Sequence, residues 1–170
     1  MPHRHHHGPH HHSLLQEGME SGLIGGTIVA TWFLILDLLQ GQPLATPSIL
    51  GQLIILGRGT PVVDKLVPEA IAAYSFLHFG GFILFGIAVC ELVHLAVKQA
   101  FFRFALLVVF VVFEVFFLGV TQIFFHGTRG FFPYWTVLVA NSLAAIGMGI
   151  YFWVKHPSLR RALRHEALGA

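Results

Sequence analysis

Six ionisable residues fall within or at the end of long apolar stretches of this sequence: Asp37, His78, Glu91, His94, Glu114 and His126. A charged group inside a lipid bilayer is costly, so such residues usually have a partner or a function. Histidine and carboxylate side chains also bind haem iron and many transition metals. These six residues are therefore the candidates for chemistry in the chain.

His78 and His126 are the candidates for cofactor binding. Only the short segment 98–100 separates the two apolar stretches that carry them, so they would lie on antiparallel neighbouring helices. At 1.5 Å per residue their depths would differ by roughly 6 Å. The pair could ligate a haem b iron axially, or could hold a transition metal together with Asp37. The alternative is two interfacial histidines without a ligand, and the difference in depth favours it.

Glu114 is the deepest acid, near the middle of the apolar stretch 101–125. Removal from water disfavours a charged carboxylate, so we expect this side chain to be neutral or hydrogen-bonded. Its predicted polar neighbours are Thr121, Gln122 and Asn141. Two roles fit Glu114: an acid that handles protons or cations, or a hydrogen bond that fixes helix packing, worth about 1 kcal/mol or less in membranes.

Glu91 and His94 are three residues apart and share one face of a helix. A Glu-x-x-His pair is half of a carboxylate di-metal site in helix bundles, but the sequence lacks the second half. We therefore predict that the nearby Lys98 and Arg103 neutralise this pair. Asp37 ends an apolar stretch, and we interpret it as an interfacial acid with access to water.

The composition indicates the solvent around these residues. Of 170 residues, 55% are hydrophobic and 11% are charged, and the mean hydropathy is +0.73. A typical soluble domain has roughly 25% charged residues, so lipid must be the solvent for much of this chain. The net charge of +2 is too small to indicate nucleic-acid binding, and the single cysteine, Cys90, excludes a disulfide within one chain.

Four apolar stretches are long enough to cross a bilayer, which predicts an all-α membrane protein with a four-transmembrane-helix bundle. The predicted transmembrane domain is 21–155, with spans at about 22–40, 70–97, 101–125 and 133–155. Small residues four apart predict close helix packing, at Gly22/Gly26/Ala30, Gly86/Cys90, Ala140/Ala144 and Ala145/Gly149.

The long loop 41–69 is predicted to be extracytoplasmic. Pro43 and Pro47 stop the preceding helix, because proline lacks an N–H donor and restricts the residue before it. The apolar segment 48–56 is too short to span the bilayer. We expect it to be interfacial or re-entrant, between helices 1 and 2 of the bundle.

The two ends of the chain differ in charge. Residues 1–20 form a histidine-rich tail that we predict to be disordered, and its seven histidines could bind a transition metal or be dispensable. Residues 156–170 form a basic tail, predicted to be an amphipathic helix on anionic lipid. Lys and Arg concentrate on the side of both termini, which predicts cytoplasmic N- and C-termini and a multi-pass protein of the inner (plasma) membrane.

The stretch Trp32–Gly51 carries the pattern WFLxxDLxxGxPLxTPSxLG. In this stretch the chain resembles small four-span bacterial membrane proteins, and the resemblance implies no activity. No nucleophile–base pair, phosphate-binding loop or Cys-x-x-Cys motif occurs, so an enzyme is not expected.

The sequence therefore favours a structural or accessory subunit that associates in the lipid bilayer, either with itself as a homo-oligomer or with a larger membrane complex. Two alternatives stay open. One is a haem- or metal-binding redox protein that uses His78 and His126, and the other is a proton or divalent-cation transporter or channel that uses Glu114.

Overall fold

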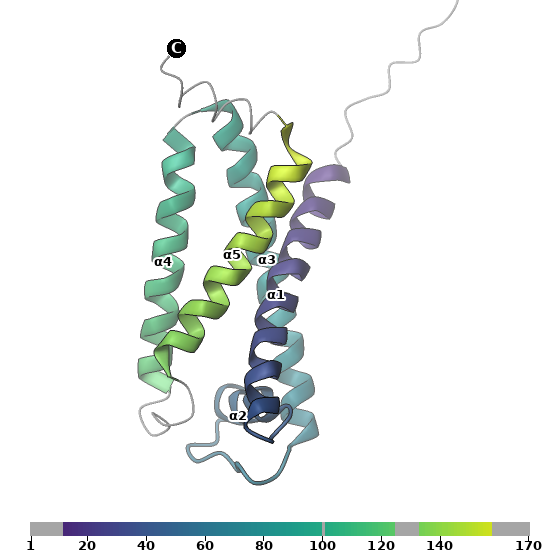
Figure 1. The fold of residues 1–170 in the computed structure, drawn as a ribbon, viewed down its shortest axis with the longest axis vertical. Helices are drawn as coiled ribbons and strands as arrows, with labels where there is room; N and C mark the ends of the chain where they lie inside the picture. Colours follow the sequence, from purple (N-terminus) through teal and green to yellow (C-terminus); the bar gives the residue numbers. More distant parts are fainter. Residues whose placement is uncertain (1–11, 100, 125–132, 158–170) are drawn as a thin grey trace, which may run out of the picture.

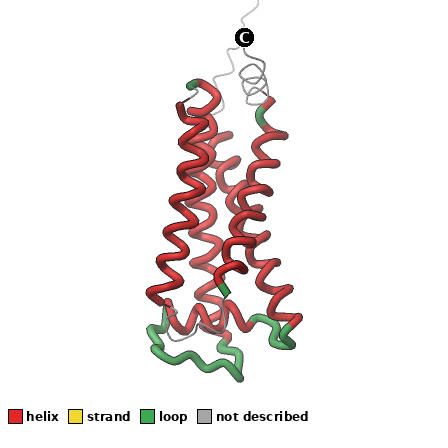
Figure 2. The backbone as a smooth tube through the Cα atoms, turned by 60° about the vertical axis from the view of Figure 1, so that its left-hand side comes forward, coloured by secondary structure: helices red, strands yellow, loops and turns green. Residues whose placement is uncertain are grey.

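A computed structural model describes residues 12–99, 101–124 and 133–157, and the regular structure in these ranges is α-helical (Figure 1). The described helices are α1 (His12–Leu39), α2 (Ala45–Ile54), α3 (Pro68–Lys98), α4 (Phe101–Phe124) and α5 (Tyr134–Lys155). The four longer helices run alongside one another (Figure 2), and the short α2 lies at the end of the bundle away from the start of α1.

Three of the described helices are long and apolar enough to cross a membrane: Leu14–Leu39, Pro68–Lys98 and Tyr134–Lys155. Large apolar side chains also lie on the outside of the bundle, and Phe76 and Leu84 are 84% and 71% exposed. Exposed apolar side chains of this size are unfavourable in water and favourable against lipid tails. The length and the apolar surface of these helices agree with the prediction of a helical membrane protein.

The helix bounds differ from the prediction at the N-terminal end. Helix α1 begins at His12, so residues 12–20, predicted to be part of a disordered tail, are helical. One reason is that Glu20 accepts hydrogen bonds from Gln16, one turn earlier, and from Tyr151 on α5. These bonds stabilise polar helix turns beyond the apolar stretch. The histidine-rich segment 1–11 lies outside the described residues.

The other bounds are close to the prediction. Helices α3 and α5 cover the predicted spans 70–97 and 133–155 to within a few residues. In α4 the apolar stretch with described side chains is Phe104–Phe117, which is shorter than a span. The predicted basic tail lies outside the described residues from residue 158 onward.

Glycines bring α1 and α3 together in the most extensive helix contact of the described chain. A Cβ atom added to Gly86 would fall 2.5 Å from the backbone nitrogen of Gly22 and 2.6 Å from its Cα. A Cβ atom added to Gly22 would fall 2.7 Å from the Cα of Ile83. Real Cβ atoms do not approach backbone so closely, so the two helices touch through these glycines. The predicted close packing at Gly22 and Gly86 is confirmed.

Helix α4 is attached mainly to α3. The rings of Phe85 on α3 and Phe113 on α4 stack with their centroids 4.4 Å apart. The contact between α4 and α5 is small, and a cavity of about 240 Å³ lies between α3, α4 and α5. Ala145 and Gly149 line this cavity, and a Cβ atom on Gly149 would meet nothing within 4 Å. The predicted close packing at this pair is therefore not found among the described residues.

Helix α2 packs on the start of α3 with a largely polar face. Gly51 lies against the backbone of Ala70, and neither residue has room for a larger side chain at the contact. The amide of Gln52, which has no exposed surface, donates to Val62 O and accepts from Val62 N, both at 3.0 Å. Ser48 Oγ accepts a hydrogen bond from Val67 N at 3.1 Å. Buried polar groups are thus paired with the loop that follows α2, and they hold it in place.

Candidate functional site

Asp37 caps α2 from the end of α1. Its carboxylate accepts hydrogen bonds from Thr46 N at 2.8 Å and from Thr46 Oγ1 at 2.6 Å. The first N–H groups of a helix have no partner within the helix, and a carboxylate there also interacts favourably with the helix dipole. Asp37 is only 4% exposed, although it also lines two cavities, and its predicted role as an interfacial acid with access to water stays a prediction.

Asp37 and His78 line one cavity of about 200 Å³ between α1, α2 and α3. His78 Nε2 lies 3.0 Å from the carbonyl oxygen of Gly26, and because a carbonyl only accepts, Nε2 carries the hydrogen. This nitrogen is therefore not free to bind a metal, and only Nδ1 is left. His126 lies outside the described residues, so the structure brings together two of the three predicted cofactor ligands.

Glu114 on α4 is 7% exposed and meets Asn141 on α5, which is 5% exposed. Asn141 Nδ2 donates to Glu114 Oε2 at 3.3 Å, which confirms one predicted neighbour. The other carboxyl oxygen, Oε1, is buried and has no hydrogen-bond partner among the described residues. The side chains of Thr121 and Gln122, the other predicted neighbours, are outside the described part of the chain.

Glu91 and His94 do not act as a pair. Glu91 is exposed, whereas the His94 ring turns to the start of α1 and contacts Glu17. His94 Nδ1 donates to Cys90 O at 2.9 Å, because this carbonyl can only accept. Glu17 of another helix is thus a charged neighbour of His94 that the sequence did not predict. The predicted neutralisation by Lys98 and Arg103 stays a prediction, because the Arg103 side chain is not described.

A second cluster, which the sequence did not predict, lies where α1 begins and α5 ends. We call Glu17, Cys90, His94 and His156 the Cys/His cluster. Glu17 Oε2 lies 3.2 Å from His156 Nε2, 3.9 Å from His94 Nε2 and 3.9 Å from Cys90 Sγ. Three possible hydrogen-bond donors therefore converge on one carboxylate oxygen.

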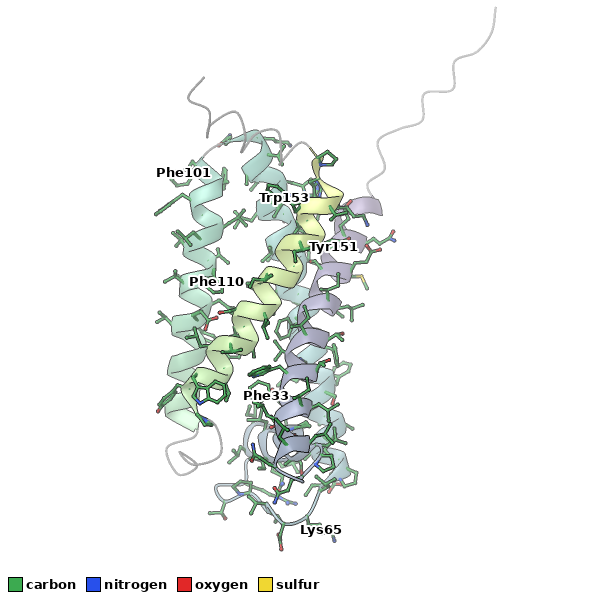
Figure 3. All side chains as sticks on the ribbon, viewed as in Figure 1. Phe33, Lys65, Phe101, Phe110, Tyr151 and Trp153 are labelled. Carbon is green, nitrogen blue, oxygen red and sulfur yellow. The ribbon has the colours of Figure 1, made fainter. Side chains whose placement is uncertain are left out.

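The next turn of α1 is tied to α5 by a separate polar group. Glu20 Oε2 accepts hydrogen bonds from Tyr151 OH at 2.5 Å and from Lys155 Nζ at 2.8 Å. Tyr151 lies on α5 at the end of the bundle where α1 begins (Figure 3). The positive charge of Lys155 is thus paired with Glu20, and the Cys/His cluster keeps its own carboxylate, Glu17.

One sequence signal for the Cys/His cluster was present. Cys90 and His94 are four residues apart, which places them on the same face of α3. Glu17 and His156, however, belong to segments that the sequence assigned to the two tails, and 139 positions separate them. Only the three-dimensional arrangement shows that these segments meet.

Comparisons with known proteins assign no relative: no family model, no curated protein and no solved structure matches the chain. The fold defines the class, a helical protein with three described helices suited to a membrane.

Proposed function

We propose that this chain is a four-span integral membrane protein that acts as a structural or accessory subunit of a membrane assembly. One observation carries the proposal: the buried polar groups around α2 hold parts of the chain to one another. Asp37 bonds to Thr46, and Gln52 bonds to Val62. His78 bonds to the backbone of α1. Polar groups used in this way stabilise a scaffold and are not available for a substrate.

The length of α4 supports a fourth span. Its 24 residues would extend about 36 Å at 1.5 Å per residue, against about 30 Å for the hydrocarbon core of a bilayer. Helix α1 begins at the end of the bundle where α5 ends (Figure 1), as an even number of spans requires. With the Lys and Arg distribution, this arrangement favours cytoplasmic termini in the inner (plasma) membrane, with α2 as an interfacial or re-entrant segment on the other side.

A topology experiment tests the spans. We expect a reporter inserted at Gly59, where a Cβ atom would meet nothing within 4 Å, to report the extracytoplasmic side. A reporter fused to the C-terminus should report the cytoplasm. Cytoplasmic activity at Gly59, or extracytoplasmic activity at the C-terminus, would contradict the proposed topology. The assembly role is tested by cross-linking in native membranes, where we expect discrete larger species, and a lone monomer would overturn the role.

Glu114 supports a second candidate function, proton or divalent-cation transfer. The supporting observation is the buried Oε1 atom, which has no hydrogen-bond partner among the described residues. An acid in such a place is costly, and in membrane proteins it often marks an ion pathway. Asn141 would then orient the carboxyl group through its bond to the other oxygen.

Glu114→Gln keeps the shape of the side chain and removes the titratable group. If the protein moves protons or divalent cations, we expect this variant in liposomes to lose the flux that the unmodified protein supports. Glu91→Gln is the matched control, because Glu91 is exposed on the neighbouring helix. Equal flux in Glu114→Gln and the unmodified protein, or no flux in either, would exclude this function for Glu114.

A further inference from the structure

We propose that the Cys/His cluster is a binding site for a divalent transition metal of the Zn²⁺ class. The side chains of Cys, His and Glu are the ligands that Zn²⁺ uses in proteins, and four ligands complete its tetrahedral shell. The cluster offers one sulfur, two imidazole nitrogens and one carboxylate. This proposal is independent of the structural role proposed above, and it uses neither His78 nor Glu114.

The distances suit a metal of this size. Metal–ligand bonds of roughly 2.0–2.3 Å in a tetrahedral site place the ligand atoms about 3.3–3.5 Å apart. Glu17 Oε2 is 3.2 Å from His156 Nε2 and 3.9 Å from both His94 Nε2 and Cys90 Sγ. The ligand atoms of Glu17, Cys90 and His94 all lie within 4.8 Å of one another. Shortening these distances by at most about 1.5 Å would bring Glu17, Cys90 and His94 to coordination distance, and His156, whose Nε2 contacts Glu17, would move in as the fourth ligand.

The orientation of His94 is already the one that a metal ligand needs. Its Nδ1 donates to Cys90 O at 2.9 Å, so Nε2 has the free electron pair when the ring is neutral. A backbone carbonyl bonded to the second ring nitrogen is the usual outer partner of a metal-bound histidine. Cys90, one turn earlier on α3, provides both this carbonyl and the neighbouring thiol.

The charges also balance. Glu17 carries one negative charge, and Cys90 provides a second when its thiol loses a proton on metal binding. The product, Zn²⁺ with one carboxylate, one thiolate and two neutral imidazoles, has no net charge, and the released proton goes to solvent. A neutral centre suits the edge of a bilayer, where an unpaired charge is costly.

Access is sufficient for an ion to enter. Cys90 is fully buried, but the side chains of Glu17 and His156 are 14% exposed and that of His94 is 34% exposed. The metal would reach the thiol along the His94 side. Once bound, it would join α1, α3 and the residue that follows α5 through bonds to each of them.

The test must separate this cluster from the histidine-rich segment, which could bind metal itself. The full-length chain is therefore made with the seven histidines of residues 1–13 replaced by glutamine, and it is purified without a metal column. We expect one Zn²⁺ per chain after dialysis. With Co²⁺ as the spectroscopic probe, we expect a sulfur-to-metal charge-transfer band, because Cys90 is the single cysteine.

In this background Cys90→Ser should abolish the charge-transfer band, and His94→Ala and Glu17→Gln should each weaken Zn²⁺ binding at least about tenfold. Glu91→Gln is the matched control and should bind as the parent does, because Glu91 is exposed and outside the cluster. Folding of each variant is checked by gel filtration and helical circular dichroism. Absence of stoichiometric Zn²⁺ in the folded parent, or an unchanged Co²⁺ spectrum in folded Cys90→Ser, would overturn the proposal.

Discussion

Gly86→Ala is expected to destabilise the folded protein by about 1–3 kcal/mol, the usual cost of adding atoms to a well-packed contact. The added methyl group would fall 2.5–2.6 Å from backbone atoms of Gly22, and backbone cannot move aside as a flexible side chain can. Helices α1 and α3 would have to separate along their most extensive contact. In a membrane this contact depends on close packing, because lipid tails are as apolar as the side chains.

Gly80→Ala on the same helix is the matched control. A Cβ atom at Gly80 would meet nothing within 4 Å, so this variant should be as stable as the parent, or more stable by up to about 1 kcal/mol from helix propensity. Thermal unfolding in detergent, followed by the loss of the monodisperse gel-filtration peak, measures both variants. Equal midpoints for Gly86→Ala and Gly80→Ala would show that the glycine contact does not hold the two helices together.

The second large effect is expected for Asp37→Ala, which should destabilise the docking of α2 by about 1–3 kcal/mol. The substitution leaves the N–H and hydroxyl of the buried Thr46 without their acceptor. Leu44, the residue that precedes α2, adopts the left-handed region at φ 67°, a conformation that costs a non-glycine residue roughly 1–2 kcal/mol. The lost hydrogen bonds and this strained residue both lie at the start of α2, so we expect the effect of the substitution to be local.

Hydrogen exchange measured by mass spectrometry can localise this effect. In Asp37→Ala, amides of α2 (Ala45–Ile54) should exchange about tenfold faster for each 1.4 kcal/mol lost, while those of α5 should be unchanged. Asp37→Asn keeps one carbonyl acceptor and should show an intermediate effect. Unchanged exchange in α2 for Asp37→Ala would mean that the two hydrogen bonds contribute nothing to its docking.

The helices could be predicted from the sequence because few backbone conformations are stable in a bilayer. Peptide groups in hydrocarbon must bond within their own segment, so long apolar stretches become helices whatever their neighbours are. The four-residue spacing of small residues likewise identified the face of α1 that meets α3, at Gly22. The same spacing also predicted close packing at Gly149, where a Cβ atom would meet nothing within 4 Å. Spacing shows which residues share a helix face, but it does not show whether another helix covers that face.

The polar partners could not be predicted in the same way. Thr46 is nine residues from Asp37, beyond a chain reversal whose geometry depends on Gly41 and Leu44. Glu17 meets His156 only because the first and last described helices pack side by side. A hydrogen bond between distant residues depends on helix rotation and depth to within about an ångström, and hydropathy does not carry that information.

The bonds from Glu20 to Tyr151 and Lys155 have a consequence for biosynthesis. Helix α1 is made first, but the partners of Glu20 are on α5, more than 130 residues later. Until α5 has been made, Glu20 lacks these two partners. This link between the first and last described helices can therefore form only after nearly the whole chain has been synthesised, so synthesis of α5 completes the polar contacts at the start of α1.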